Sequence, residues 1–130
     1  TSQIVFKVNI DMVGRLDGDT LELQGHRSVQ GLQPILDKAN QGLDIKLDYV
    51  WTMVANSDHW PFINAGIPGF MFHTGLHKEY HKPEDDPETI DVEGLGAIGI
   101  LSRRFITHLG TAEVTPKFRK ESLTEKQPRK

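Results

Sequence analysis

The sequence predicts an α/β fold, a partial three-layer sandwich with a mixed, partly parallel sheet. Apolar and polar residues alternate in several short segments, which is typical of strands with one buried face. Between these segments apolar residues recur at helical spacing, and glycine or proline separates most of the elements. Strand and helix patterns that follow one another along a chain are typical of layered folds with a partly parallel sheet.

Two strands, a helix and a third strand are predicted in the first half of the chain. Residues 3–10 alternate, with Asp11 at the carboxyl end of the strand, and the next short strand covers 21–25. Apolar residues at helical spacing predict a helix that starts near residue 31 and stops at Gly42, a residue type that commonly ends helices. Residues 43–52 alternate again and predict the next strand.

A short helix, a buried strand and a loop are predicted next. The helix extends from Ser57-Asp58, either of which could cap it, to Ala65. Residues 67–72 form an apolar run typical of a buried strand. Residues 73–89 contain three of the six histidines, five acidic residues and two prolines, so we expect a polar loop.

The last predicted helix begins after Asp91, which is a good N-cap residue. Three glycines on this helix, Gly94, Gly96 and Gly99, would let another element approach closely. Its apolar stripe consists of Leu95, Ile98, Leu101, Phe105, Ile106 and Leu109.

Residues 1–110 are expected to form one compact unit, followed by a flexible basic tail over 111–130. The tail holds six Lys/Arg against three Asp/Glu and few large apolar residues, too few to form a core. The body holds nine Lys/Arg against fifteen Asp/Glu, and this acidic balance argues against nucleic-acid binding. No apolar run approaches the roughly 18–20 residues of a membrane helix. Because cysteine is absent, any metal site must use His, Asp or Glu.

Three segments carry candidate chemical groups, and each has a plain structural alternative. Asp11 at its strand end is either a turn residue or a metal ligand. In the Ser-Asp-His sequence at 57–59, the carboxylate could orient a metal-bound imidazole, or the segment could simply start a helix. In the loop 73–86, three imidazoles could hold zinc while Tyr80 hydrogen-bonds an oxyanion, or the loop could only be solvated. The spacing matches no self-contained zinc motif.

Taken in order, these segments resemble the C-terminal half of the di-zinc aminopeptidase family, exopeptidases whose relatives include the glutaminyl cyclases. The resemblance covers roughly residues 3–109, and the ordered set is more specific than any single piece. The matching stretches are Asn9-Ile10-Asp11-Met12-Val13-Gly14-Arg15, then Ser57-Asp58-His59 with Phe62 and Gly66-Ile67-Pro68, and finally Phe72-His73-Thr74-Gly75-Leu76-His77 leading to Tyr80-His81-Lys82-Pro83-Glu84-Asp85.

The resemblance implies a role for each matching residue. Asp11 corresponds to a ligand of one zinc ion, and His81 corresponds to a ligand of the other. Tyr80 falls where some members place a hydroxyl near the tetrahedral intermediate. The residues expected to shape or support the pocket are Ser57, Asp58, His59, Thr74, Gly75 and His77.

The resemblance also implies that the chain carries only part of an active site. Family members place a His, a metal-bridging Asp and a Glu pair, which includes the general base, before the strand that leads to Asp11. The ten residues before Asp11 leave no room for these groups. We therefore expect an isolated chain that is inactive, but that contributes to zinc-dependent hydrolysis of N-terminal peptide bonds in an intact enzyme. A secreted or periplasmic location is favoured by the resemblance alone.

Two other functions stay open at this point. The chain could be a non-catalytic binding or assembly module on the same scaffold, or a transferase of the glutaminyl-cyclase kind. In each case half of a larger sheet would leave the strand at 3–10 uncovered, and bare sheet surface invites pairing with another chain. We therefore expect self-association through exposed sheet surface.

Overall fold

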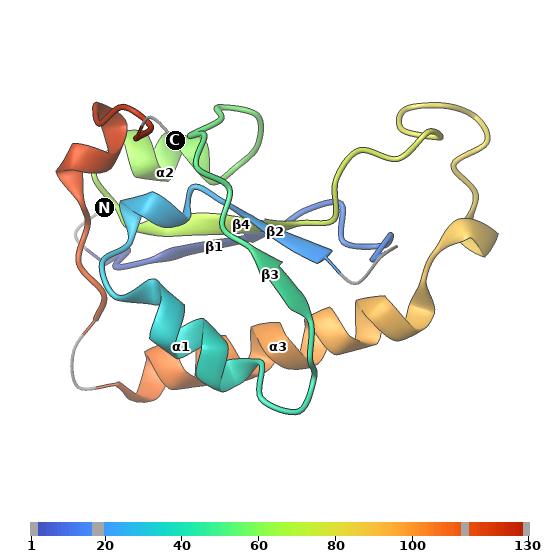
Figure 1. The fold of residues 1–130 in the computed structure, drawn as a ribbon, viewed down its shortest axis with the longest axis horizontal. Coiled ribbons are helices and arrows are strands. Elements are labelled where there is room, and N and C mark those ends of the chain that lie inside the picture. Colours follow the sequence, from blue (N-terminus) through green and yellow to red (C-terminus); the bar gives the residue numbers. More distant parts are fainter. Residues whose placement is uncertain (1–2, 17–19, 113–114, 129–130) are drawn as a thin grey trace.

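Four strands form a single mixed sheet in the computed structural model, which describes residues 3–16, 20–112 and 115–128 (Figure 1). Their order across the sheet is β1-β4-β2-β3. β1 lies parallel to β4 and β2 lies parallel to β3, whereas β2 and β4 run antiparallel. The mixed, partly parallel sheet expected from the sequence is therefore confirmed. The strands are β1 (Lys7–Ile10), β2 (Thr20–Gln24), β3 (Lys46–Asp48) and β4 (Gly69–His73).

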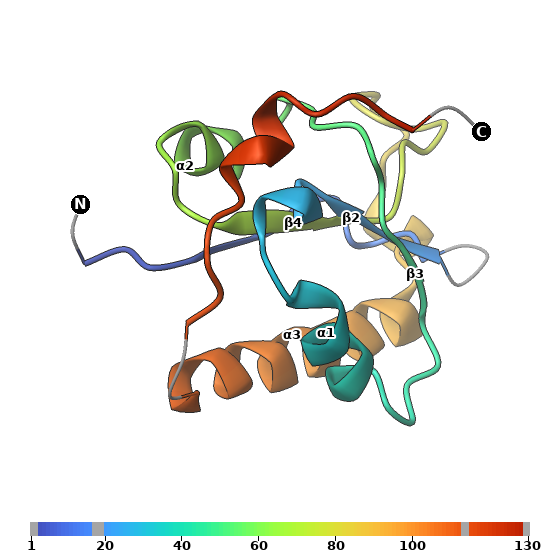
Figure 2. The same ribbon diagram turned by 60° about the vertical axis from the view of Figure 1, so that its left-hand side comes forward.

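Helices cover both faces of this sheet and complete the three predicted layers (Figures 1 and 2). The longer helices α1 and α3 lie against one face, and the short α2 lies on the other face together with the C-terminal segment. Within the part of the chain that the structure describes, no helix is long and apolar enough to cross a membrane. The helices are α1 (Leu32–Ala39), α2 (Trp60–Asn64) and α3 (Val92–Thr111), and the 3-10 segments are η1 (His26–Ser28), η2 (Pro87–Thr89) and η3 (Lys120–Leu123).

The core fills the space between the sheet and the pair α1 and α3. Phe70 and Phe72 of β4 and Phe105 of α3 are fully buried. The Phe70 ring packs edge-on against Phe72 and Phe105, with centroids 4.9 and 5.3 Å apart. Burial of such apolar surface is the main force that holds helices onto a sheet. Other fully or almost fully buried members are Leu21, Leu23, Leu36, Ile98 and Leu101.

The start of α3 is built as the sequence predicts. Asp91 caps the helix, because its Oδ1 accepts a hydrogen bond from the Gly94 amide at 2.9 Å. Gly94 also packs closely, since a Cβ atom at this position would lie 2.7 Å from Leu16 Cβ. At Gly96 and Gly99 no described atom of another element lies within 4 Å of the corresponding position, so the close approach expected there is wrong for the described residues.

Two features of the predicted pattern differ from the structure. Leu95 and Ile106 belong to the predicted stripe of α3 but are 39% and 50% exposed, because they lie on the flanks of the buried face. The strands predicted over 3–10 and 43–52 are also shorter, since only Lys7–Ile10 and Lys46–Asp48 pair with a neighbouring strand. The alternation of apolar and polar residues thus extends further along the sequence than the pairing with a neighbouring strand.

The predicted cap of the short helix is wrong. α2 begins at Trp60 with His59 as its N-cap, and no side chain caps the helix. The Ser57 hydroxyl donates to Asp11 instead, and Asp58 is exposed. The Ser57 hydroxyl, which could have capped α2, is thus bound to the carboxylate that follows β1.

β1 and β4 approach each other at a position that only glycine can occupy. A Cβ atom on Gly69 would lie 2.6 Å from Lys7 O, far inside the contact distance. The buried Ser28 holds the same residue from the other side, because its Oγ donates to Gly69 O at 2.7 Å and accepts from Gly69 N at 3.1 Å. η1 is therefore fastened to the start of β4.

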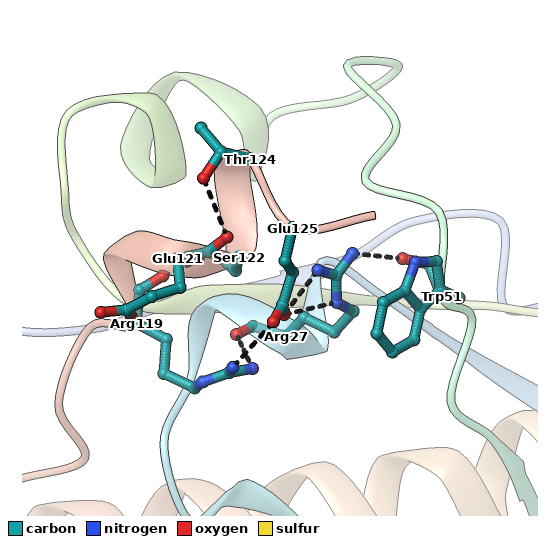
Figure 3. A network of polar contacts seen from close by, with 7 residues as sticks. All are labelled: Arg27, Trp51, Arg119, Glu121, Ser122, Thr124 and Glu125. Carbon is teal, nitrogen blue, oxygen red and sulfur yellow. Dashed lines mark hydrogen bonds and ion pairs between the residues drawn. The ribbon is translucent and has the colours of Figure 1, made fainter. Parts of the chain in front are cut away.

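The C-terminal segment is fastened to the body by a group that we call the tail clamp, formed by Arg27, Trp51, Arg119 and Glu125 (Figure 3). Arg27 is 5% exposed, stacks on the Trp51 ring at 3.8 Å and donates from Nη1 to Trp51 O at 3.0 Å. Its Nε donates to Glu125 Oε1 at 3.1 Å, and Arg119 donates to Glu125 Oε2 at 3.2 Å. Arg27 Nη2 also lies 2.5 Å from Glu125 Oε1, an ion pair whose angle is poor for a hydrogen bond.

Backbone contacts reinforce the tail clamp. Gln30 N donates to Lys117 O, and Arg119 N donates to Ser28 O, both at 2.9 Å. These contacts place residues 115–128 against the body, which differs from the flexible tail that the composition predicts. The polar side chains that composition associates with disorder here bind groups far away in the sequence. Residues 113–114 and 129–130 of the predicted tail lie outside the described residues, and the division of the chain at residue 110 stays a prediction.

Candidate active site

Asp11 lies at the carboxyl ends of the parallel strands β1 and β4, where ligands commonly bind in such sheets. Its amide donates to Phe72 O at 3.2 Å, so the chain still follows β4 at this point. Ser57 Oγ donates to Asp11 Oδ2 at 2.6 Å, and Asn9 Nδ2 donates to Ser57 Oγ at 2.9 Å. These two bonds orient the carboxylate and leave Oδ1 without a hydrogen-bond partner among the described residues.

The backbone turns directly after Asp11 and meets the end of β4. Met12 has a φ of 55°, a left-handed conformation that side chains other than glycine rarely adopt. Thr74 donates twice to Met12 O, from its amide at 3.1 Å and from its Oγ1 at 2.5 Å. Thr74 therefore holds the turn that directly follows Asp11, so these two predicted site residues lie close together.

His59 lies inside the molecule, whereas its neighbour Asp58 faces solvent. Neither ring nitrogen of His59 has a hydrogen-bond partner of acceptable geometry among the described residues. Burial lowers the pKa of His59, and the Val54 backbone and the negative charge of Asp11 oppose this only in part. The side chain is therefore kept neutral. The structure does not bring the Asp58 carboxylate onto the His59 ring, so an orienting role for Asp58 has no observed contact to support it.

The loop after β4 is held near the sheet by charge pairs. Arg15 Nη2 donates to Asp85 Oδ1 at 2.8 Å. His77 lies between two carboxylates, with Nδ1 3.4 Å from Glu79 and Nε2 3.8 Å from Asp85. These contacts fix the base of the loop. Both ring nitrogens of His77 face carboxylates, so its ring holds the loop together and is not left free to bind a ligand.

Tyr80 and His81 form the exposed part of the same loop. Their rings stack with centroids 3.8 Å apart and an interplanar angle of 20°. Tyr80 is 38% exposed, and His81 has a φ of 55°, which turns the chain sharply at this residue. Both side chains are accessible, as a ligand and an oxyanion donor would need to be.

Glu22 and His73 form a polar pair on β2 and β4; His73 is one of the three imidazoles of the loop, and Glu22 was not predicted to belong to the site. They are cross-strand partners, and His73 Nδ1 lies 3.3 Å from Glu22 Oε2. The same Nδ1 accepts the Gly75 amide at 2.9 Å, so it carries no proton for Glu22 while that bond exists. The contact arises from the antiparallel pairing of the two strands, which the sequence alone does not reveal. His73 thus fixes the Thr74-Gly75 turn that starts the loop.

The donor groups of this arrangement decide whether it could hold zinc. Among residues 3–16, 20–112 and 115–128, no group of three or more His, Asp or Glu side chains is placed to hold a metal ion. A catalytic zinc usually has three protein ligands and a water. Asp11 and His81 on their own therefore do not fit a complete zinc site. Two surface hollows of ≈ 420 and ≈ 440 Å³ lie elsewhere, beside Asp91 and Arg119 respectively.

Comparisons with known proteins place the chain within one family. The model of peptidase family M28 matches residues 1–106. No curated protein sequence matches the chain. Among solved structures, the chain is similar to the Legionella pneumophila LapA aminopeptidase, with a TM-score of 0.68 and 17% identity over 82% of this chain. It is also similar to BSAP, a zinc aminopeptidase from Bacillus subtilis, with a TM-score of 0.66 and 25% identity over 87% of this chain. It spans 31% and 30% of the length of those two proteins.

Proposed function

Since the chain belongs to peptidase family M28, we propose that it forms the part of a zinc-dependent aminopeptidase domain that contributes Asp11 and His81 as metal ligands. The intact domain hydrolyses N-terminal peptide bonds, so its substrate is a peptide. Support comes from the likeness to a zinc aminopeptidase from Bacillus subtilis, of which this chain spans 30%.

The observation that carries the proposal is the state of the Asp11 carboxylate. One oxygen is fixed by the Ser57 hydroxyl at 2.6 Å, while the other has no partner within the described residues. A metal-ligating carboxylate commonly has this form, with one hydrogen bond that orients it and a free lone pair for the ion. A carboxylate that only formed a turn would accept bonds from nearby amides, as Asp91 does from Gly94.

The chain alone is not expected to catalyse the reaction. Two candidate ligands on separate elements do not reach the three that a catalytic zinc requires, and the described residues offer no third. His81 also lies on an exposed loop rather than in an enclosed site. The remaining ligands and the general base would have to come from outside these residues.

An assay of the purified chain tests the incomplete site. We expect no release of nitroaniline from leucine p-nitroanilide when zinc is added, and no tight zinc binding by calorimetry. Turnover that His81→Ala abolishes would show that a complete site exists, and would overturn this part of the proposal.

A chimeric enzyme tests the contribution of the two ligands. Residues 3–109 would replace the equivalent part of the Bacillus subtilis zinc aminopeptidase, and circular dichroism would establish that the chimera folds. Asp11→Ala and His81→Ala should each abolish its activity. The matched controls Asp48→Ala and His108→Ala change the same residue types elsewhere and should leave activity unchanged. A folded, active chimera that tolerates both site substitutions would favour a non-catalytic module on the peptidase scaffold.

A further inference from the structure

The loop between β4 and η2 is attached at both ends to the segment 12–15, which follows β1. At the start of the loop, the Thr74 amide donates to Met12 O at 3.1 Å. At its end, the Asp91 amide donates to Gly14 O at 2.9 Å. Between these two points the loop projects beyond the end of the sheet (Figure 1). Backbone bonds to a single short segment therefore hold both ends of the loop.

One side-chain contact holds the middle of the loop to the same segment. Arg15 Nη2 donates to Asp85 Oδ1 at 2.8 Å. The side chain of Arg15 is 11% exposed, whereas that of Asp85 is 43% exposed. A guanidinium withdrawn from water to this extent needs a charged partner, and hydrogen bonds between charged groups are among the stronger ones. We therefore expect more from this pair than from a fully exposed ion pair, which contributes little.

A series of contacts connects Asp85 with the exposed part of the loop. Asp85 Oδ2 lies 3.8 Å from His77 Nε2. The His77 ring lies edge-on to the Tyr80 ring, with centroids 6.3 Å apart and an interplanar angle of 89°. The Tyr80 ring in turn stacks on His81 at 3.8 Å. A change in the position of Asp85 should therefore move Tyr80 and His81 as well.

We propose that Arg15 is a positioning residue, which acts through Asp85 on the exposed part of the loop. Arg15 follows Asp11 closely in the sequence, so the ion pair sets the distance between this segment and the residues Tyr80 and His81. The backbone bonds at the two ends of the loop do not fix that distance, because a loop can move between fixed ends. The part of these residues in catalysis rests on the proposed function, whereas the effect on the loop depends only on the contacts described.

Hydrogen exchange followed by NMR tests the effect on the loop in the chain itself. Tyr80 N donates to His77 O at 3.1 Å and Lys82 N donates to Glu79 O at 2.9 Å, so both amides report on opening of the loop. Arg15→Met removes the charge but keeps an apolar stem, and should speed exchange at both amides by about fivefold or more. Unchanged exchange at both amides would overturn the proposal.

Two controls separate movement of the loop from a general loss of stability. The Asp91 amide, which binds Gly14 O at the end of the loop, should exchange at its wild-type rate in Arg15→Met. Arg103→Met changes the same residue type at an exposed position of α3 and should leave exchange at the Tyr80 amide unchanged. Equal acceleration at Asp91 and Tyr80 would indicate a general loosening of the fold and would overturn the proposal.

A double-mutant cycle tests whether Arg15 acts through Asp85. Asp85→Asn changes only the more exposed end of the pair, so it should fold even if Arg15→Met does not, and it should speed exchange in the loop by a similar factor. The double variant should exchange no faster than either single variant, because each substitution removes the same contact. Unchanged exchange in Asp85→Asn would overturn the proposal, as would additive effects of the two substitutions.

The chimeric aminopeptidase tests the consequence for catalysis. Arg15→Met should lower its kcat by about tenfold or more and change KM less, since a small misplacement of groups that act in the reaction slows the chemical step. Arg103→Met should leave both constants unchanged. Activity that requires His81 but tolerates Arg15→Met would overturn the positioning role and leave the proposed function intact. Tolerance of both Arg15→Met and His81→Ala would contradict the proposed function, while the exchange measurements would still decide whether Arg15 holds the loop.

Discussion

The tail clamp and the candidate active site are both built from polar side chains, yet they leave those side chains in different states. In the tail clamp, the buried Arg27 stacks on Trp51, donates to its carbonyl and pairs with Glu125. In the candidate site, Asp11 keeps one oxygen without a partner, and both ring nitrogens of His59 lack one among the described residues.

This difference is what the proposed function requires: the tail clamp holds the fold together, and the candidate site keeps polar groups for a ligand. A buried polar group without a partner lowers stability, so a fold retains it only where something else requires it. The Arg27 hydrogen bond also holds the pKa of Glu125 below its ordinary value, which keeps the carboxylate charged at neutral pH. Stability should therefore fall when the tail clamp is altered and rise when the buried His59 is replaced by an apolar residue.

The largest expected effect is the loss of the tail clamp in Arg27→Ala. The free energy of unfolding should fall by about 2–4 kcal/mol, because the stacking area on Trp51, the hydrogen bond to its carbonyl and the contacts with Glu125 are lost together. Urea unfolding measures the change, with the exposed Arg103→Ala as a matched control that should change it by less than about 0.5 kcal/mol. Hydrogen exchange at the Arg119 amide should also become faster. If the tail is flexible as its composition predicts, Arg27→Ala will behave like the control.

Two serines compare the same substitution in the two kinds of environment. Ser28 is completely buried and satisfies both backbone groups of Gly69, so Ser28→Ala should destabilise the fold by about 2–3 kcal/mol. Ser57 binds the half-buried Asp11, and Ser57→Ala should lower stability by less than about 1 kcal/mol. Chemical unfolding of both variants under one set of conditions gives the comparison. Equal losses would mean that Asp11 is held as firmly as the core.

Replacing His59 should have the opposite sign. His59→Leu removes two nitrogens that have no hydrogen-bond partner among the described residues and keeps a side chain of similar size, so we expect stability at neutral pH to rise by about 1 kcal/mol. Differential scanning calorimetry would show a higher melting temperature. A lower one would show that His59 has a polar partner that stabilises the fold.

The smallest expected effect is a pH dependence that starts below the ordinary histidine pKa of 6.5. Burial lowers the pKa of both His26 and His59, so the unfolded chain takes up protons that the folded chain excludes. Stability from this source is therefore complete above about pH 7 and decreases as the pH falls below about 6.5. Unfolding at a series of pH values should show a shallower decrease in His59→Leu than in the wild type. An unchanged slope would contradict a neutral His59 in the folded state.

Much of the fold could be predicted because local patterns agree with the layers. Asp91 predicted the start of α3, and the apolar run at 67–72 predicted β4. The position of β4 in the sheet could not be predicted, since pairing with β1 and β2 depends on contacts between distant residues. The contacts of the tail could not be predicted for the same reason, because Arg27 and Glu125 are separated by 98 positions and composition does not reveal that they pair.

The candidate site shows the same limit more sharply. The resemblance to the peptidase family is confirmed by the match to residues 1–106, and it singled out Asp11 and Ser57 before their contact was known. The ligand and oxyanion roles of His81 and Tyr80 stay predictions, since no contact in the structure tests them. Glu22 was missed, because a charged residue in an alternating strand has the same pattern whether it faces solvent or a histidine.

The long separation between Arg27 and Glu125 also sets an order of events during synthesis. Arg27 leaves the ribosome early, and Gly69 soon provides the strand that fastens η1, but the Arg27 guanidinium waits for a carboxylate 98 positions later. Until then its charge has only the Trp51 ring and carbonyl as partners. If the chain folds as it is synthesised, the residues of its sheet are available before the charge of Arg27 can be balanced, and such incompletely paired states are ones that chaperones and proteases act on. Arg27 gains its carboxylate partner only once Glu125 has been synthesised.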